Sequence, residues 1–318
     1  MKSEKRPLVI SASRRTDIPC YYTSWLLERL REQYVLVRQV RDYHRIRKVD
    51  LSVDAVACIV FWSKHPVPLM EHLDVLSPYP YYVQYTITGY GVDIEPRIVP
   101  YTESIDHFRR FADAIGPDRL IWRYDPILFT KEYPVAYHEE VFSRIASSLS
   151  GYTHRCVFSF LDRYRHIEQH LDALQVIGED TSTIDRMARL IAQETVRHRM
   201  QAFTCAEPYD LTRYGIAHGA CIDAELVEHL SGLAVNNQKD RSQRPDCRCM
   251  QSVDIGMYNT CLNMCAYCYA NYDEKLVHAQ YAKARSTSPL QIGAVEPHDT
   301  IESDETVVKE PQLSLFGQ

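Results

Sequence analysis

The sequence predicts an α/β fold, specifically a (β/α) barrel or a partial TIM-like barrel. Short apolar runs rich in β-branched and aromatic residues alternate with segments of helical spacing, which is typical of parallel strands joined by helices. Seven such runs in roughly 200 residues, with no opening Gly-x-Gly-x-x-Gly, favour a barrel over a doubly wound sheet, which stays the alternative. The predicted strands are Leu8 to Ser11, Tyr34 to Arg38, Ala55 to Trp62, Tyr81 to Thr88, Leu120 to Tyr124, Cys156 to Phe160 and Ala202 to Cys205.

Helical spacing fills most of the intervals between these runs. The predicted helices are Tyr22 to Arg31, Val67 to Leu76, Thr102 to Ile115, Tyr137 to Leu149, Ile167 to Leu174 and Ile184 to Arg199. One further unit follows near the end of the chain, with a strand at 252–258, a loop at 259–268 and a helix at 269–285. In a barrel the last strand lies beside the first, so we expect this unit to lie next to Leu8 to Ser11.

Composition and charge indicate one globular body followed by a tail. The chain has 318 residues, of which 45% are hydrophobic and 25% charged, and it contains no apolar run long enough for a membrane span or a signal peptide. We therefore expect a cytoplasmic protein. Of the net charge of -6, residues 286–318 carry -5. We predict a barrel domain over 1–285, with a cysteine-rich segment at 205–268, and a disordered acidic tail at 286–318.

The most specific motif is Cys261-x-x-x-Cys265-x-x-Cys268. Three thiolates on one short loop can bind three irons of a [4Fe-4S] cluster and leave the fourth iron open to a small molecule. The motif resembles that of the radical S-adenosylmethionine enzymes, in which this iron binds the methionine group and an electron from the cluster generates a 5'-deoxyadenosyl radical. Zinc is the alternative, but it prefers four closed ligands with paired Cys-x2-Cys spacing.

A second set of cysteines precedes this motif and comprises Cys205, Cys221, Cys247 and Cys249. Four thiolates complete the coordination of an additional [4Fe-4S] cluster, and zinc is again the alternative. The other three cysteines lie in or beside apolar runs, so we expect them in the core.

Polar residues follow six of the predicted strands, and in a barrel the loops at these carboxyl ends carry the active site. Each alone could be a cap or a structural ion pair, but six polar strand ends together indicate a site. The candidate catalytic residues are Arg14, Arg15, Asp17, Lys64, Arg123, Asp125 and Glu207. The candidate cofactor-binding residues are Ser11, Ser13, Thr86, Thr88 and Tyr267.

The chain also resembles an uncharacterised bacterial family, the domain-of-unknown-function family 1848, to about Tyr272. The residues that carry this resemblance are 10–19, 61–64, 88–90, 122–126, 205–207, 218–223 and the terminal cysteine loop. The resemblance implies a radical-S-adenosylmethionine-like protein, makes the strand-end residues the expected site and supplies no substrate. The Gly-Gly-Glu stretch that usually holds the methionine amino group in that superfamily is replaced here by Ser11 to Asp17.

The chain ends with a peptide, Gln312-Leu313-Ser314-Leu315-Phe316, that resembles the short segment by which bacterial repair proteins bind the DNA sliding clamp. Gln312 would make polar contacts, and Leu313, Leu315 and Phe316 would enter a hydrophobic groove. A clamp partner implies a DNA substrate. A basic stretch that could contact phosphates and a base comprises Arg38, Arg41, Tyr43, His44, Arg45, Arg47 and Lys48.

Three functions are compatible with these features. The first is a radical S-adenosylmethionine enzyme that repairs or modifies DNA, with chemical logic similar to that of spore photoproduct lyase. The second is the same class of enzyme acting on a small metabolite, and the third is a non-enzymatic Fe-S or zinc protein.

Overall fold

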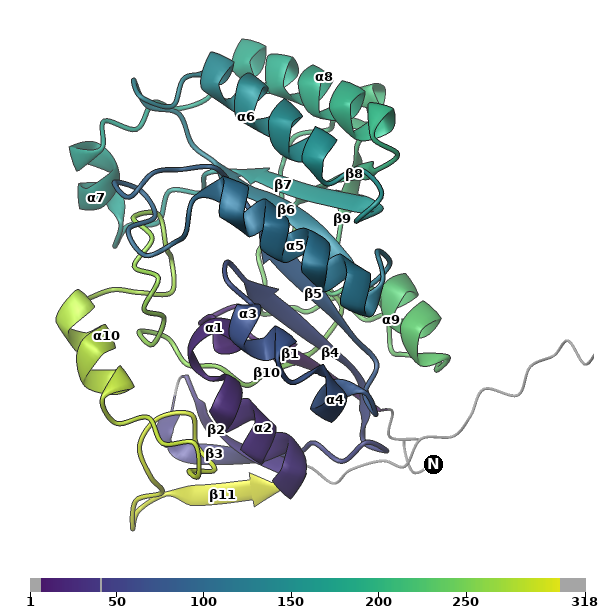
Figure 1. Ribbon diagram of the computed structural model, residues 1–318. Helices are drawn as coiled ribbons and strands as arrows, with labels where there is room; N and C mark the ends of the chain where they lie inside the picture. The colour runs from purple at the N-terminus through teal and green to yellow at the C-terminus, as the bar shows by residue number, and fades with distance from the viewer. Residues whose placement is uncertain (1–6, 41, 304–318) are drawn as a thin grey trace, which may run out of the picture.

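The computed structural model describes residues 7–40 and 42–303, and its centre is a sheet of eight parallel strands (Figure 1). Across the sheet the strands follow the order β10-β1-β4-β5-β6-β7-β8-β9. Their bounds are Leu8–Ala12 for β1, Val56–Ser63 for β4, Tyr81–Thr86 for β5, Leu120–Ile127 for β6, Arg155–Phe160 for β7, Gln201–Cys205 for β8, Ala217–Gly219 for β9 and Val253–Asp254 for β10. The predicted α/β class with parallel pairing is confirmed.

The sheet is open, because β9 and β10 are its two edges and no pairing joins them in the described part of the chain. The prediction was a (β/α) barrel or a partial barrel, and the described strands do not close into a barrel. The expectation that the strand before the Cys261 motif lies beside the first strand is confirmed, because β10 pairs with β1 in parallel. Ile10 is opposite Val253, and Ser11 is opposite Asp254. This pairing brings the terminal cysteine loop to the carboxyl end of β1.

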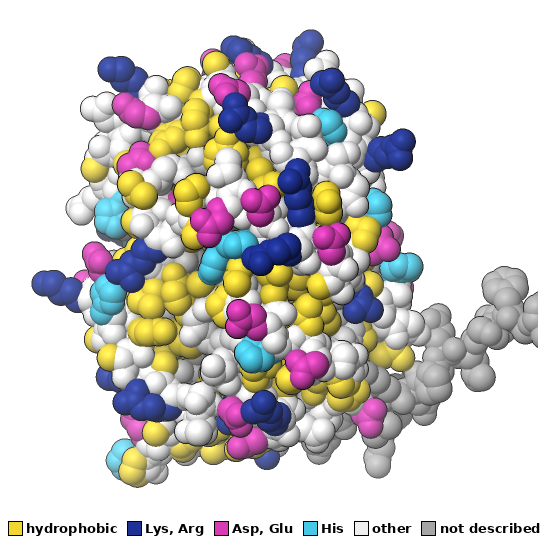
Figure 2. All heavy atoms as spheres, in the orientation of Figure 1, with side chains coloured by type: hydrophobic (Ala, Val, Ile, Leu, Met, Phe, Trp, Pro, Cys, Tyr) yellow, Lys and Arg dark blue, Asp and Glu magenta, His cyan; other side chains and the backbone are white. Residues whose placement is uncertain are grey.

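One face of the sheet is covered by long amphipathic helices, which comprise α5 (Tyr101–Ile115), α6 (Val135–Ser148) and α8 (Thr181–Arg197) (Figure 1). Strand residues that point to this face, such as Phe61, Val83 and Trp122, form one large core with the buried sides of the helices. Figure 2 shows acidic and basic side chains scattered over the outer surface of the molecule in this view. No helix in the described ranges is both long and apolar enough to cross a membrane.

The opposite face of the sheet packs against α9 (Ala224–Ser231) and parts of the 233–250 segment. Because side chains alternate along a strand, the neighbours of the first set, such as Val60, Tyr82 and Ile121, point to this second core. Both faces of the sheet are thus buried, which explains why its strands read as nearly continuous apolar runs. The same alternation directs polar residues near the ends of these strands toward a cavity on this face.

Several helices, both long and short, begin at a capping carboxylate. Asp180 accepts a hydrogen bond from Thr183 N at the start of α8, and Asp273 caps α10 through Leu276 N. The remaining helices are α1 (Ile18–Tyr21), α2 (Thr23–Glu32), α3 (Val67–Met70), α4 (Leu73–Leu76), α7 (Glu168–Ala173), α10 (Glu274–Tyr281) and a 3-10 turn at Thr212–Tyr214.

A second sheet of three strands contains β2 (Tyr34–Gln39), β3 (Asp42–Asp50) and β11 (Thr300–Ser303). The first of these strands was expected in the main sheet, but it pairs antiparallel with β3. The flexible tail expected from residue 286 does not begin there, because β11 pairs with β3 and Leu290 forms a bridge with Leu36. Residues 286–303 thus belong to the folded body, and 304–318 lie outside the described residues.

Candidate functional site

All seven cysteines of the two predicted sets line one cavity of about 630 Å³ on the second face of the sheet, beside the carboxyl ends of its strands. This volume is typical of small-molecule sites, which span roughly 300–1,000 Å³. The other polar lining residues relevant here are Ser13, Arg14, Arg15, Asp17, Lys64, Thr86, Arg123, Asp125, Arg244 and Tyr267.

The loop that carries Cys261, Cys265 and Cys268 is held by hydrogen bonds from both of its sides. Tyr22 OH donates to Thr260 O at 2.7 Å, and Asn271 Nδ2 donates to Cys261 O at 2.7 Å. The backbone N–H of Ala270 approaches Cys268 Sγ at 3.4 Å. These contacts hold the three thiols on the wall of the cavity. Burial raises the pKa of all three thiols, and the backbone N–H of Ala270 opposes this rise at Cys268.

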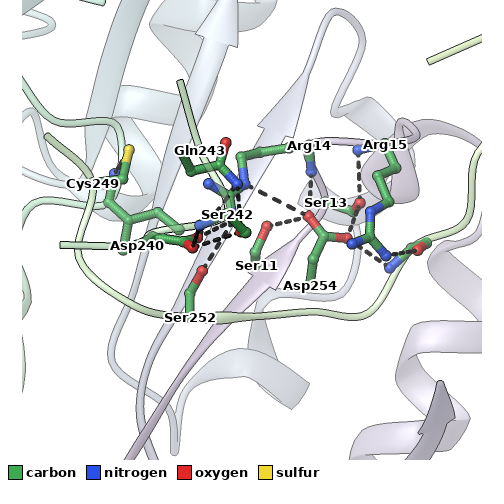
Figure 3. A network of polar contacts seen from close by, with 12 residues as sticks. Ser11, Ser13, Arg14, Arg15, Asp240, Ser242, Gln243, Cys249, Ser252 and Asp254 are labelled. Carbon is green, nitrogen blue, oxygen red and sulfur yellow. Dashed lines mark hydrogen bonds and ion pairs between the residues drawn. The ribbon is translucent and has the colours of Figure 1, made fainter. Parts of the chain in front are cut away.

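Asp254, at the end of β10, ties this loop to the end of β1 (Figure 3). Its carboxylate accepts hydrogen bonds from the hydroxyls of Ser11 and Ser13, from Arg14 N at 2.9 Å and from Gly256 N at 3.0 Å. A Cβ on Gly256 would lie 2.3 Å from Ser13 Oγ, so this close approach requires glycine. Ser11 and Ser13 thus position the loop through Asp254.

Asp17 makes an equivalent connection to the end of β4. Its Oδ2 accepts hydrogen bonds from Lys64 N at 2.9 Å and Asn263 Nδ2 at 3.0 Å, and its Oδ1 accepts one from Cys20 N at 3.1 Å. Burial raises the pKa of the Asp17 carboxyl group. With its oxygens engaged in this way, Asp17 joins α1, β4 and the cysteine loop.

The sequence analysis missed Glu95, which organises the wall beside Cys265. Glu95 is buried, and its Oε1 lies 2.7 Å from both Lys64 Nζ and Thr88 Oγ1 and also accepts a hydrogen bond from Tyr267 OH. The ammonium of Lys64 counters the rise that burial causes in the pKa of the Cys265 thiol. Glu95 does not directly follow a predicted strand, so the pattern of polar strand ends that identified the other residues did not include it.

The four cysteines of the second set line the part of the cavity wall formed by the end of β8, the turn after β9 and the segment before β10. Cys205 Sγ and Cys221 Sγ are 3.1 Å apart, and Ile222 N lies 3.4 Å from Cys249 Sγ. Hydrogen bonding to Cys205 and Cys249 lowers the pKa of the Cys221 thiol, and contact with Cys249 lowers that of Cys247. The same contacts, together with burial, raise the pKa of Cys205 and Cys249, so Cys221 and Cys247 are the two thiols of this set that favour the thiolate form.

Two guanidinium groups face these sulfurs. Arg123 Nη1 lies 2.8 Å from Cys221 Sγ and 3.2 Å from Gln84 Oε1, and its other end pairs with Asp125. Arg14 lies between Asp240 and Asp254 (Figure 3), and its Nη1 is buried with no hydrogen-bond partner. An orphaned cationic N–H beside a group of thiols fits an anionic metal–thiolate centre, which would supply the missing acceptor.

The geometry of the sulfurs bears on the kind of metal. Zinc–sulfur bonds of about 2.3 Å require four sulfurs in a compact tetrahedron. In neither cysteine set do three sulfurs all lie within 4.8 Å of one another. Among the described residues, that criterion is met by His44, Glu296 and Asp299. The sulfurs are therefore not arranged as a compact zinc tetrahedron, and thiolates are the ligands that [4Fe-4S] clusters take. The close Cys205–Cys221 pair keeps zinc open as the alternative for the second set.

Three predicted site residues do not line the cavity, namely Ser11, Thr88 and Glu207. The first two support it through Asp254 and Glu95. Glu207 accepts a hydrogen bond from Phe160 N at 2.7 Å, and burial raises its pKa to about 7. It holds the end of β7 behind the cavity wall.

The predicted basic stretch lies mainly on β3, where the C-terminal segment neutralises much of its charge. Arg38 forms two 2.8 Å hydrogen bonds with Asp299, and Arg45 binds Glu302 through both of its oxygens. Arg41 of this stretch and the clamp-like peptide at 312–316 lie outside the described residues.

The fold and the arrangement of the site place this chain among α/β proteins with a cysteine-lined cavity. It belongs to the family described as Domain of unknown function (DUF1848), which matches residues 9–270. No curated protein and no solved structure matches the chain. The matched range contains both cysteine sets and ends before α10 and β11.

Proposed function

We propose that this chain is a radical S-adenosylmethionine-type enzyme with two metal–thiolate centres. Cys261, Cys265 and Cys268 would hold a [4Fe-4S] cluster with one open iron. The observation that carries the proposal is the convergence of two cysteine sets, distant in sequence, on one cavity. Held by these three residues, such a cluster would supply the single electron needed for reductive cleavage of a sulfonium.

The surrounding residues support such chemistry by holding charge and geometry. Lys64 places a cation beside Cys265, and its pairing with Glu95 fixes it there. Arg123 and Arg14 do the same for the second set, which would hold a further [4Fe-4S] cluster or a zinc ion. Because an anionic cluster in a buried site needs nearby donors and cations, these residues lower the cost of its burial.

DNA is the proposed substrate class, and the sliding clamp is the proposed partner. The support is the terminal peptide that contains Gln312, Leu313, Leu315 and Phe316. Repair or modification of a base would follow the logic of hydrogen abstraction and return that spore photoproduct lyase uses. A small-metabolite enzyme with the same cofactors is the alternative, and deletion of 312–316 followed by a clamp-binding assay discriminates between the two.

The test is iron and sulfide analysis of anaerobically purified protein, with electron paramagnetic resonance before and after addition of S-adenosylmethionine. We expect about eight irons per chain if both sets hold cubane clusters, and a reduced signal that changes with S-adenosylmethionine. Zinc, or a properly reconstituted cluster whose signal ignores S-adenosylmethionine, would overturn the radical mechanism.

Cysteine variants assign the centres. Cys261→Ser should abolish the response to S-adenosylmethionine and leave the second centre, whereas Cys249→Ser should remove the second centre and leave that response. Cys20→Ser is the matched control, because this partly exposed cysteine is not among the cavity-lining residues. Its metal content should equal that of the wild type.

A further inference from the structure

An aromatic rim, defined as Tyr164, His166, Tyr258, Tyr269 and Tyr272, extends from the wall of the cavity to the surface. We infer that this rim is a stacking surface for an unpaired nucleotide of a DNA strand. The inference rests on the proposed DNA substrate and names the form in which that substrate binds. Tyr164, Tyr258 and Tyr269 line the cavity, and Tyr272 has 52% of its surface exposed.

The rim is built by two loops that meet across the mouth of the cavity. One follows β7, and the other carries the Cys261 motif (Figure 1). The ring centroids of Tyr164 and Tyr269 are 5.5 Å apart, and those of His166 and Tyr272 are 4.5 Å apart. Tyr258 and Tyr272 lie nearly parallel, with an interplanar angle of 22°. The rings therefore pack against one another across the two loops.

A guanidinium group accompanies these rings. Arg15 lines the cavity, lies 5.2 Å from the centre of the Tyr258 ring and donates one hydrogen bond to Gly256 O. It forms no ion pair with a carboxylate in the described part of the chain, unlike Arg14, Arg38 and Arg123. Its remaining N–H groups can donate to a phosphate, because a guanidinium has five donors in a planar fork.

Exposed aromatic rings beside an arginine are the elements by which proteins bind single-stranded nucleic acid. A base stacks on a ring through its π-face whatever its identity, and the cation binds the backbone. The sulfurs lie inside a cavity, so a base must leave the duplex stack to approach them. The rival surface on β3 is less suited to phosphate, because Asp299 and Glu302 occupy Arg38 and Arg45.

The test is binding of fluorescent 12-nucleotide oligonucleotides to the full chain, measured by anisotropy under anaerobic conditions for single-stranded DNA, the matching duplex and single-stranded RNA. We expect single-stranded DNA to bind most tightly. Tyr272→Ala should weaken this binding by about tenfold, and Tyr272→Phe should restore it, because the ring supplies the stacking energy. Arg15→Ala should reduce the slope of the logarithm of the binding constant against the logarithm of salt concentration by about one.

Tyr43→Ala is the matched control, since Tyr43 is 54% exposed on β3 and is also stacked against an arginine. It should bind as the wild type does. Equal binding of duplex and single strand, tighter binding of RNA, no binding, or a loss confined to Tyr43→Ala would each overturn the inference. Metal analysis of the same samples separates the two proposals. A protein that contains its metal but does not bind DNA would refute only the proposed stacking role of the aromatic rim. A metal-free protein whose DNA binding depends on Tyr272 would refute only the proposed enzyme activity.

Discussion

Lys64 Nζ and Glu95 Oε1 lie 2.7 Å apart within the wall that carries Cys265, and both side chains are largely buried. Lys64 is the first residue after β4, whereas Glu95 lies in the long connection between β5 and α5. Thr88 and Tyr267 donate to the same carboxylate oxygen. One acidic side chain thus joins two strand connections to the cysteine loop, and this dependence can be tested.

Glu95→Gln should destabilise the protein by about 3–5 kcal/mol, because removal of one partner leaves the buried Lys64 charge uncompensated. Chemical denaturation followed by circular dichroism measures this loss. Glu140→Gln is the control, since its ion pair with Arg144 is exposed and should contribute less than about 1 kcal/mol. Recovery of stability in the double variant with Lys64→Met would show that the unpaired charge is the cause, and additive losses would contradict it.

Arg123→Gln should weaken metal binding at the second cysteine set without affecting the first. The guanidinium contacts Cys221 Sγ at 2.8 Å, and its positive charge stabilises the Cys221 thiolate. We expect iron per chain to fall from about eight toward about four if both centres are cubane clusters. Arg186→Gln, which removes an exposed ion pair with Glu139, should retain full loading. Loss of the response to S-adenosylmethionine in Arg123→Gln would contradict the assignment of separate centres.

His138 should make the protein less stable as the pH falls below about 6.5. Burial lowers the pKa of its imidazole to about 4, and its nitrogens are engaged by Tyr124 OH at 2.8 Å and Leu128 O at 2.9 Å. Between these pH values the unfolded chain binds the proton and the native protein does not, so stability falls by about 3 kcal/mol as the pH drops from 6.5 to 4. Urea titrations at several pH values in this range give the free energy of unfolding at each pH. This free energy should change less steeply with pH in His138→Gln than in the wild type, and an equal pH dependence would exclude His138 as the cause.

Asp299→Asn should release the C-terminal segment from the small sheet. Arg38 binds both oxygens of Asp299 and lowers its pKa, so the carboxylate contributes stability above its ordinary pKa that is lost as the pH falls through the native value. The hydrogen-exchange protection factors of residues 294–303, which correct for the intrinsic rate at each pH, should fall in the variant at neutral pH and in the wild type in acid. Glu302→Gln, which removes an exposed pair, should change exchange much less.

Strands with continuous apolar sequence were predictable because both of their faces are buried. Val56–Ser63 and Arg155–Phe160 match the expected runs within one or two residues. The strand Asp42–Asp50 was not predicted, because its alternation is masked by charges whose partners lie about 250 residues later. Whether the sheet is open or closed into a barrel was not predictable either, because this depends on where the edge strands lie in space and not on any local sequence pattern.

The site likewise contains residues that were predictable from the sequence and residues that were not. Cysteine spacing and polar strand ends identified both cysteine sets, Lys64 and Arg123, all of which line the cavity. Glu95 and Asp240 were missed, because each lies in a connection between elements and acquires its role only through contacts distant in sequence. Neighbours along the chain carry no signal for such contacts.

The pairing of β10 with β1 determines when the cavity can first exist during synthesis. Ser11 bonds to a residue 243 positions later, so the ribosome releases nearly the whole chain before this edge of the sheet can form. Nascent chains and fragments that end before residue 253 would present the second cysteine set without the loop that faces it. Assembly of the two centres is therefore a late event, and a chain cut between them would lose the cavity even if the rest of the sheet remained folded.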